Sequence, residues 1–147
     1  MENKYNSKVP LQRIIALVIM DIMSILLVSF AALYIRYDFS FQDIDPLFFK
    51  HCENLLIPNI IGTLIFFVIW KLYRSVWRYA SANELVNIVG ATACASLAQF
   101  VYCKFTDNRM PRSYSVLYFF LLTLAICCIR FGYRISVSYT HLTLPTT

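Results

Sequence analysis

Residues Ile14–Ile35 read IIALVIMDIMSILLVSFAALYI, an apolar run of 22 residues whose single charge is Asp21. At 1.5 Å per residue, a helix of this length is about 33 Å long, enough to cross the roughly 30 Å hydrocarbon layer of a membrane. The run is longer than the apolar part of a cleavable signal peptide, and no clear small-x-small cleavage site follows it. We therefore expect it to remain in the mature protein as a membrane-spanning helix.

The composition of the whole chain agrees with a lipid-embedded protein. Of its 147 residues, 59% are hydrophobic and 14% are charged, against about 45–50% and about 25% in soluble domains. A soluble domain of this size buries only about 68–70% of its unfolded surface, so much of the apolar content would face water. The same composition excludes an intrinsically disordered chain, which needs few apolar residues and a high net charge.

Three further apolar segments predict three more spans, at about residues 55–72, 85–103 and 114–133. The second is the weakest, because Pro58, Asn59 and Gly62 lie near its start and are expected to bend or delay the helix. The third is rich in small residues, which let helices approach closely in lipid, and Ser81 with Glu84 matches a capping box at its start. The sequence thus predicts an all-α membrane protein with four transmembrane helices.

The distribution of basic residues predicts the orientation of these spans. With four spans, eight of the thirteen Lys and Arg residues lie on the side that holds both termini. By the positive-inside rule, both termini are expected to be cytoplasmic. We divide the chain into a cytoplasmic segment at 1–13, a four-helix transmembrane domain at 14–135 and a tail at 136–147. The eight basic residues are Lys4, Lys8, Arg13, Lys71, Arg74, Arg78, Arg130 and Arg134.

The segment Trp70–Ser81, WKLYRSVWRYAS, has the most informative pattern of side chains. On a helix, two stripes would lie side by side, an aromatic one of Trp70, Tyr73 and Trp77 and a cationic one of Lys71, Arg74 and Arg78. Such residues gather at the membrane interface, where they contact lipid headgroups. A sharper hypothesis is that Arg74 and Arg78 bind the diphosphate of a lipid-linked sugar, since guanidinium groups match phosphate oxygens.

Asp21 is the one charge in the first span and is its eighth residue. An acidic side chain at such a depth costs about 2.5–3.5 kcal/mol or more, which suggests a partner. Arg130 is the one charge in the fourth span and lies near its end, so an Asp21–Arg130 pair would fix how the two spans pack. The alternatives are that Asp21 is protonated, or that it bonds Ser24 or Gln99.

No catalytic, cofactor-binding or metal site is expected in this chain. The five cysteines have no metal-ligand spacing, and four lie in apolar spans, where Cys behaves as a small hydrophobe. Cys52 and Cys103 are the pair that a disulfide near the outer face would use. Gly62, Gly90 and Gly132 are too far apart to form a phosphate-binding loop. The net charge of +5 is explained by basic residues that flank the spans, so nucleic acid is not an expected partner.

Two runs of the sequence, with an Asp-bearing first span, carry a resemblance to a known family. They are LYRSVWRYASANEL at Leu72–Leu85 and MPRSYSVLYFFLLTLAICCIRFGYR at Met110–Arg134. The chain resembles the N-terminal membrane domain of bacterial polysaccharide biosynthesis proteins, the membrane-anchored nucleotide-sugar 4,6-dehydratases and epimerases. The likeness covers about Leu11–Arg134. Its most specific part is Tyr73–Ser81, and Pro111–Ser113 supports it.

The resemblance implies a function for the four helices. In that family they precede two cytoplasmic nucleotide-binding-fold domains, the last of which binds NAD(P) and acts on a UDP-activated amino sugar. Neither domain has a counterpart here, so no catalytic residue can be carried across. The chain is therefore expected to be the membrane-anchoring domain of such an enzyme in the bacterial inner membrane, with NAD(P) bound by the missing catalytic part. The tail at 136–147 looks like a non-native end of a fragment.

The sequence leaves two other functions open. The polyprenyl-phosphate sugar-1-phosphate transferases can carry a similar four-helix front end. A free-standing small membrane protein, which packs against a partner through the small residues of the third span, is the alternative from another class. The expected partners are membrane lipid, a lipid-linked glycan carrier and a second copy of the chain.

Overall fold

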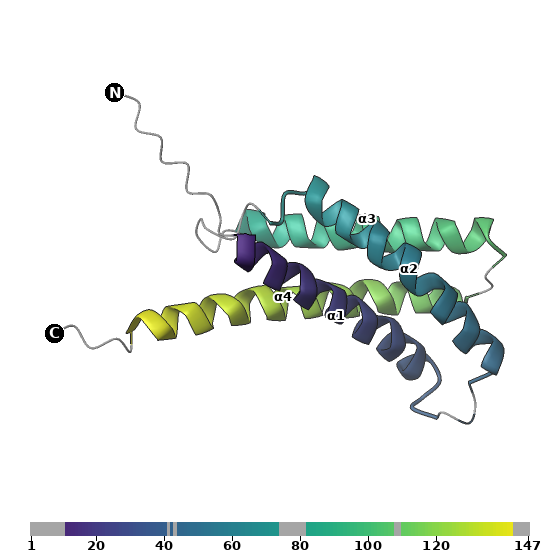
Figure 1. The fold of residues 1–147 in the computed structure, drawn as a ribbon. Coiled ribbons are helices and arrows are strands. Elements are labelled where there is room, and N and C mark those ends of the chain that lie inside the picture. The colour runs from purple at the N-terminus through teal and green to yellow at the C-terminus, as the bar shows by residue number, and fades with distance from the viewer. Residues whose placement is uncertain (1–10, 41, 43, 74–81, 108–109, 143–147) are drawn as a thin grey trace.

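The computed structural model describes residues 11–40, 42, 44–73, 82–107 and 110–142, and the regular secondary structure within these ranges is helical (Figure 1). The helices are α1 (Leu11–Arg36), α2 (Pro46–Ile69), α3 (Ala82–Phe105) and α4 (Arg112–Leu142). Each of the four contains a stretch that is long and apolar enough to cross a membrane. This architecture is consistent with the all-α membrane protein predicted from the sequence.

The helices form a bundle in which each one packs against two others. α1 contacts α2 and α4, and α3 contacts the same two helices. The start of α1 and the end of α4 lie at one end of the bundle, which we call the terminal end (Figure 1). The connections from α1 to α2 and from α3 to α4 lie at the other end, which we call the opposite end.

The interior of the bundle is built from rows of side chains spaced by four residues. In α4 the buried row is Tyr114, Tyr118, Leu122, Ile126 and Arg130. In α1 it is Leu17, Asp21, Ile25, Ser29 and Leu33. Rows of this spacing form ridges along which helices pack against one another. Asp21 and Arg130 belong to these rows, so both charged side chains lie inside the bundle.

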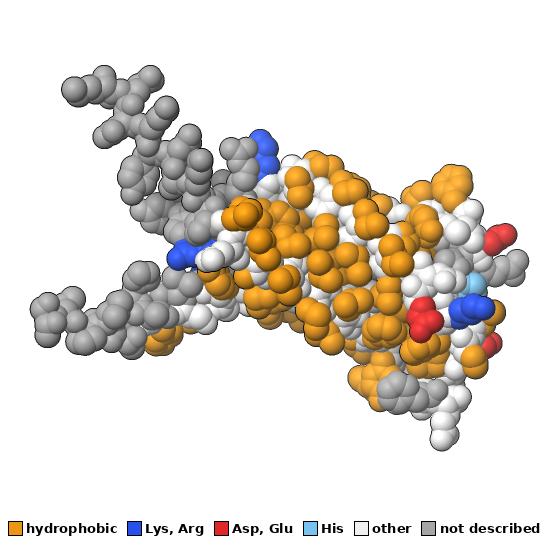
Figure 2. Space-filling model, viewed as in Figure 1, with side chains coloured by type: hydrophobic (Ala, Val, Ile, Leu, Met, Phe, Trp, Pro, Cys, Tyr) orange, Lys and Arg blue, Asp and Glu red, His pale blue; other side chains and the backbone are white. Residues whose placement is uncertain are grey.

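The outer surface of the bundle is apolar over its middle. Hydrophobic side chains cover the centre of the face seen in Figure 2, and the charged side chains visible on that face lie toward the two ends. Large apolar residues from all four helices are exposed, among them Leu27, Ile65, Leu97 and Phe120. An apolar surface of this extent is unfavourable in water and is what a spanning helix presents to lipid.

The start of α2 differs from the prediction. The helix begins at Pro46, nine residues before the predicted start at 55, and it continues through Pro58. Asp45 caps it, because its Oδ1 accepts a hydrogen bond from the backbone N–H of Leu47 at 3.0 Å. Proline fits the first turn of a helix, where its missing N–H is not needed. The expected delay at residues 58–62 is therefore wrong.

The other predicted spans lie within longer helices. α1 and α3 extend the predicted ranges 14–35 and 85–103 by a few residues at each end. α4 begins at Arg112 and runs to Leu142, past the predicted end at 133. The helix thus continues into the segment 136–147, which the sequence analysis set apart as a tail.

Candidate functional site

A buried polar cluster joins α1, α4 and the connection after α2, in the half of the bundle nearer to the terminal end. Asp21 is fully buried and Arg130 is 4% exposed. Arg130 Nη2 donates to Asp21 Oδ2 at 3.3 Å, and the hydroxyl of Tyr73 donates to the same oxygen at 2.8 Å. Arg130 Nη1 donates to the backbone carbonyl of Leu72 at 3.1 Å. We call these four residues the Asp21 cluster; the structure brings Asp21 and Arg130 together and adds Tyr73 and Leu72.

The end of α2 places two members of the cluster. Lys71 has a φ of 53°, in the left-handed region. Its N–H bonds the carbonyl of Val68 at 3.0 Å, and the N–H of Leu72 bonds the carbonyl of Phe67 at 3.0 Å. These two bonds form a Schellman motif, which ends a helix and redirects the chain. The redirected chain brings the Leu72 carbonyl and the Tyr73 hydroxyl to the cluster.

The helical stripes predicted after Ile69 do not hold over residues 70–73, because the Schellman motif ends α2 there. Trp70 packs against α3, since a Cβ built on Gly90 would lie 2.6 Å from the Trp70 ring. Lys71 is exposed, whereas Tyr73 turns inward to Asp21. The remaining predicted members of the stripes, Arg74, Trp77 and Arg78, lie outside the described residues.

The electrostatics of the cluster favour the protonated form of Tyr73. The Arg130 guanidinium lies 5.5 Å from the centroid of the Tyr73 ring, within the range of a cation–π contact. Burial, followed by the nearby Asp21 carboxylate, raises the pKa of Tyr73 above its ordinary value. Tyr73 therefore keeps its proton and remains a hydrogen-bond donor to Asp21.

The chemical capacity of the cluster is limited. Asp21 Oδ1 and Arg130 Nε have no hydrogen-bond partner among the described residues, so the ion pair uses one carboxylate oxygen. Arginine stays charged at any accessible pH and cannot serve as a general acid or base. The arrangement can neutralise a buried charge and hold α1, α4 and the connection after α2 together.

A second ion pair, which was not predicted from the sequence, joins α3 to α4. Arg134 Nη2 lies 2.6 Å from Glu84 Oε2, and Glu84 is buried. Glu84 was predicted to complete a capping box with Ser81, which lies outside the described residues. The sequence contains a signal for this pair. Arg134 follows Arg130 by four residues, so the two side chains lie on the same face of α4.

Ser24 and Gln99, the alternative partners predicted for Asp21, do not form a hydrogen bond with it. Ser24 Oγ donates to the carbonyl of Met20 in its own helix at 2.8 Å. The amide of Gln99 is buried and has no hydrogen-bond partner within the described part of the chain. Neither residue bonds Asp21, which instead accepts hydrogen bonds from Tyr73 and Arg130.

The cysteines do not form the disulfide considered for Cys52 and Cys103. All five cysteines are free thiols and all lie in the described ranges. Cys52 Sγ lies 3.8 Å from the carbonyl oxygen of Ser29 and 3.8 Å from the hydroxyl of Tyr114. Over residues 11–40, 42, 44–73, 82–107 and 110–142, no three His, Cys, Asp or Glu side chains lie close enough to hold a metal ion.

Comparison with known proteins adds no assignment. No protein-family model, no curated protein and no solved structure matches this chain. The side chains described above are therefore the basis on which a function can be assigned.

Proposed function

We propose that this four-helix unit is the membrane anchor of a bacterial nucleotide-sugar 4,6-dehydratase or epimerase. The observation that carries the proposal is that α1 begins and α4 ends at the same end of the bundle (Figure 1). A domain that followed α4 would lie on the same side of the membrane as the start of α1. The basic residues predict that this side is the cytoplasm, where nucleotide sugars are found. The enzyme class comes from the resemblance described above.

The residues of the bundle favour anchoring over catalysis. The Asp21 cluster ties α1 and α4 to the connection after α2, which is a structural role. The three glycines lie inside α2, α3 and α4, and none has a positive φ. They do not fit an NAD(P) site, which needs a glycine-rich turn between a strand and a helix. NAD(P) would therefore be bound by a catalytic domain outside the described helices.

Anchoring would act by raising local concentration. An enzyme held at the inner membrane releases its product beside transferases that use membrane-bound lipid carriers. Membrane lipid and a lipid-linked glycan carrier are thus the partners that this function implies. Arg74 and Arg78, outside the described residues, remain the candidates for contact with the diphosphate of the carrier.

The gene itself provides the first test. In place of the tail at 136–147, we expect the native reading frame after the codon for Arg134 to encode a G-x-x-G-x-x-G motif after a strand. A stop codon at that point would contradict the anchor function and favour a free-standing interaction protein. A continuation that encodes a sugar-1-phosphate transferase would replace the proposed enzyme class with that one.

The second test separates anchoring from catalysis in the intact protein. Deletion of residues 1–134 should release the enzyme from the membrane, leave turnover of soluble nucleotide sugar unchanged and lower glycan output in cells. An unrelated four-helix membrane domain fused in the same place should restore glycan output. If turnover itself fell in the soluble enzyme, the helices would contribute to catalysis and the proposal would be wrong.

A further inference from the structure

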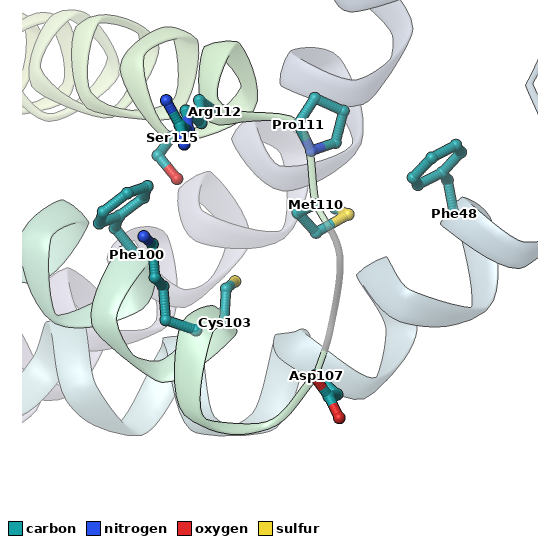
Figure 3. Close-up of a pocket in the computed structure, with 9 residues that line it drawn as sticks. Phe48, Phe100, Cys103, Asp107, Met110, Pro111, Arg112 and Ser115 are labelled. Atoms are coloured by element: carbon teal, nitrogen blue, oxygen red, sulfur yellow. The ribbon is translucent and has the colours of Figure 1, made fainter.

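Two adjoining cavities lie between α3 and α4 toward the opposite end of the bundle. The first has a volume of about 360 Å³ and is shown in Figure 3. The second has a volume of about 420 Å³ and extends along the two helices. Phe100, Arg112 and Ser115 line both, so the two cavities form one continuous space, which we call the α3–α4 groove. Each volume lies within the range of about 300–1,000 Å³ found for small-molecule sites.

The mouth of the groove is cationic. Lys104 and Arg112 line it and are exposed, and neither forms an ion pair within the described residues. The Lys104 ammonium lies 5.4 Å from the centroid of the Phe100 ring. Asp107 is the one acid among the described lining residues, and its carboxylate points away from Phe100 and Arg112 (Figure 3). The mouth can therefore accept an anion.

The position of Arg112 strengthens this preference. Arg112 is the first residue of α4, and the start of a helix carries the positive end of its dipole. Phosphate groups bind readily at such positions, because backbone N–H groups and the dipole both favour negative charge. Two cationic side chains and a helix start thus face the same space.

The deeper part of the groove is apolar. Its lining includes Ala93, Leu97, Val116 and Phe119. Along α3, Lys104 and Ala93 are about 16 Å apart at 1.5 Å per residue, which is about half of the hydrocarbon thickness of a membrane. The groove therefore runs from cations near one membrane surface to about the midplane, which matches the reach of one lipid chain in one leaflet.

We propose that the α3–α4 groove binds one anionic membrane phospholipid, with its phosphate between Lys104 and Arg112 and one acyl chain along Leu97 and Phe119. Charge complementarity at the mouth selects the headgroup, and the apolar lining holds the chain. The site lies at the other end of the bundle from Trp70 and Lys71, two of the residues for which the sequence suggested lipid-phosphate contacts. It does not depend on the anchoring function, because the residues that would hold the lipid are chosen from the lining of the groove and not from any role of the bundle as an anchor.

The test is lipid retention by the purified chain, measured by native mass spectrometry after incubation with equal amounts of phosphatidylglycerol and phosphatidylcholine. We expect selective retention of phosphatidylglycerol. The double variant Lys104→Gln, Arg112→Gln should lower this retention about 30-fold, at about 1 kcal/mol for each interfacial cation. Equal retention of the two lipids by the original chain, or no loss in the double variant, would overturn the proposal.

Matched variants separate a specific site from a general loss of charge. Arg36→Gln with Lys50→Gln removes two exposed cations near the same end of the bundle that do not line the groove, so retention should be unchanged. Lys104→Arg with Arg112→Lys keeps the charges and should keep the lipid even if the neutral variant folds poorly. A loss of retention in the Arg36 and Lys50 control equal to that in the groove variant would contradict the site.

Two further probes identify which part of the lipid is recognised. Ala93→Leu fills the deep part of the groove, so it should weaken lipid retention while leaving both cations in place. Inorganic phosphate and diacylglycerol should each compete poorly against phosphatidylglycerol, because inorganic phosphate has no acyl chain and diacylglycerol has no phosphate. If inorganic phosphate displaced the lipid at equal concentration, the mouth would be a simple anion site and the proposal would fail.

Discussion

Among single residues, Asp21 imposes the strongest requirement on this bundle. A charged carboxylate within an apolar environment is costly, and the cost is offset when a cation and a hydrogen-bond donor reach it. Arg130 supplies the cation and Tyr73 the neutral donor, both to the same carboxylate oxygen. Arg130 in turn satisfies the backbone of Leu72. The three contacts link segments that are far apart in the chain.

Removing one charge of this pair should be worse than removing both. Asp21→Leu leaves the Arg130 guanidinium buried without a counter-ion, and loss of one partner of a buried pair costs about 3–5 kcal/mol. The double variant Asp21→Leu, Arg130→Leu should lose less stability than either single variant, and so clearly less than the sum of the two losses. The measurement is the free energy of unfolding in mixed detergent micelles. Additive losses would show that the two residues are not coupled.

Tyr73→Phe should lower the free energy of unfolding by about 1.5–3 kcal/mol, the usual contribution of a hydrogen bond to a charged group. The ring and its contact with Arg130 remain in this variant, so the loss reports on the hydroxyl alone. Tyr102→Phe, at an exposed tyrosine of α3, is the matched control and should have no effect. An equal effect of the two substitutions would rule out a specific role for the Tyr73 hydroxyl.

The contribution of Tyr73 should also depend on pH. Its pKa in the folded protein is raised above the ordinary value of 10.0, because burial and Asp21 disfavour the phenolate. Below pH 10 the residue is protonated in both the folded and the unfolded chain, so its stabilising effect is fully present. Above pH 10 the unfolded chain ionises first and stability falls. The difference in stability between the original chain and Tyr73→Phe should therefore shrink between pH 10 and pH 11, as followed by thermal unfolding in detergent.

At the scale of elements, helix ends and close contacts decide how the helices fit. α1 ends as α2 does: Asp38 has a φ of 48°, its N–H bonds the carbonyl of Ile35, and the N–H of Phe39 bonds the carbonyl of Tyr34. The rings of Tyr34 and Phe39 meet edge to face, with centroids 5.1 Å apart. This is the apolar contact that often accompanies a Schellman motif.

The contact between Trp70 and α3 predicts different outcomes for two glycines. Gly90→Ala should destabilise the bundle by about 1–3 kcal/mol, because the new methyl group would overlap the Trp70 ring. Gly62→Ala, in α2, meets no atom within 4 Å and should be neutral or stabilise the helix by up to about 1 kcal/mol. The check is the melting temperature of each variant in the same detergent. Equal shifts would mean that Trp70 does not pack against Gly90.

Much of the helical architecture could be predicted, because span length and apolarity are local properties of the sequence. The turns that follow α1 and α2 could not, since Asp38 and Lys71 occupy positions where glycine is the usual signal. The Asp21–Arg130 pair could be predicted, because Asp21 is the one acidic residue in the first predicted span and Arg130 is the one basic residue in the fourth. Tyr73 was not, because its place in the cluster depends on the turn at Lys71.

At the scale of the whole molecule, the two ends of the bundle should lie on different sides of a membrane. Alkaline phosphatase fused after Asp38 or Asp107 should be active, since the basic residues predict that this end faces the periplasm. Fusions after Tyr73 or Arg134 should be inactive, and a fluorescent protein at those positions should fluoresce. The reverse pattern of activity would overturn the predicted orientation.

The length of α4 has a mechanical consequence. Its 31 residues make a rod of about 46 Å, longer than the roughly 30 Å hydrocarbon layer, and its end projects from the bundle (Figure 1). Any domain joined to this rod would have its height above the lipid and its rotation about the helix axis fixed together. Each inserted residue would raise that domain by about 1.5 Å and turn it by about 100°. The exact number of residues in the rod sets the rotation of the domain. This rotation, more than the length of the connection, would then decide which face of the domain meets the membrane.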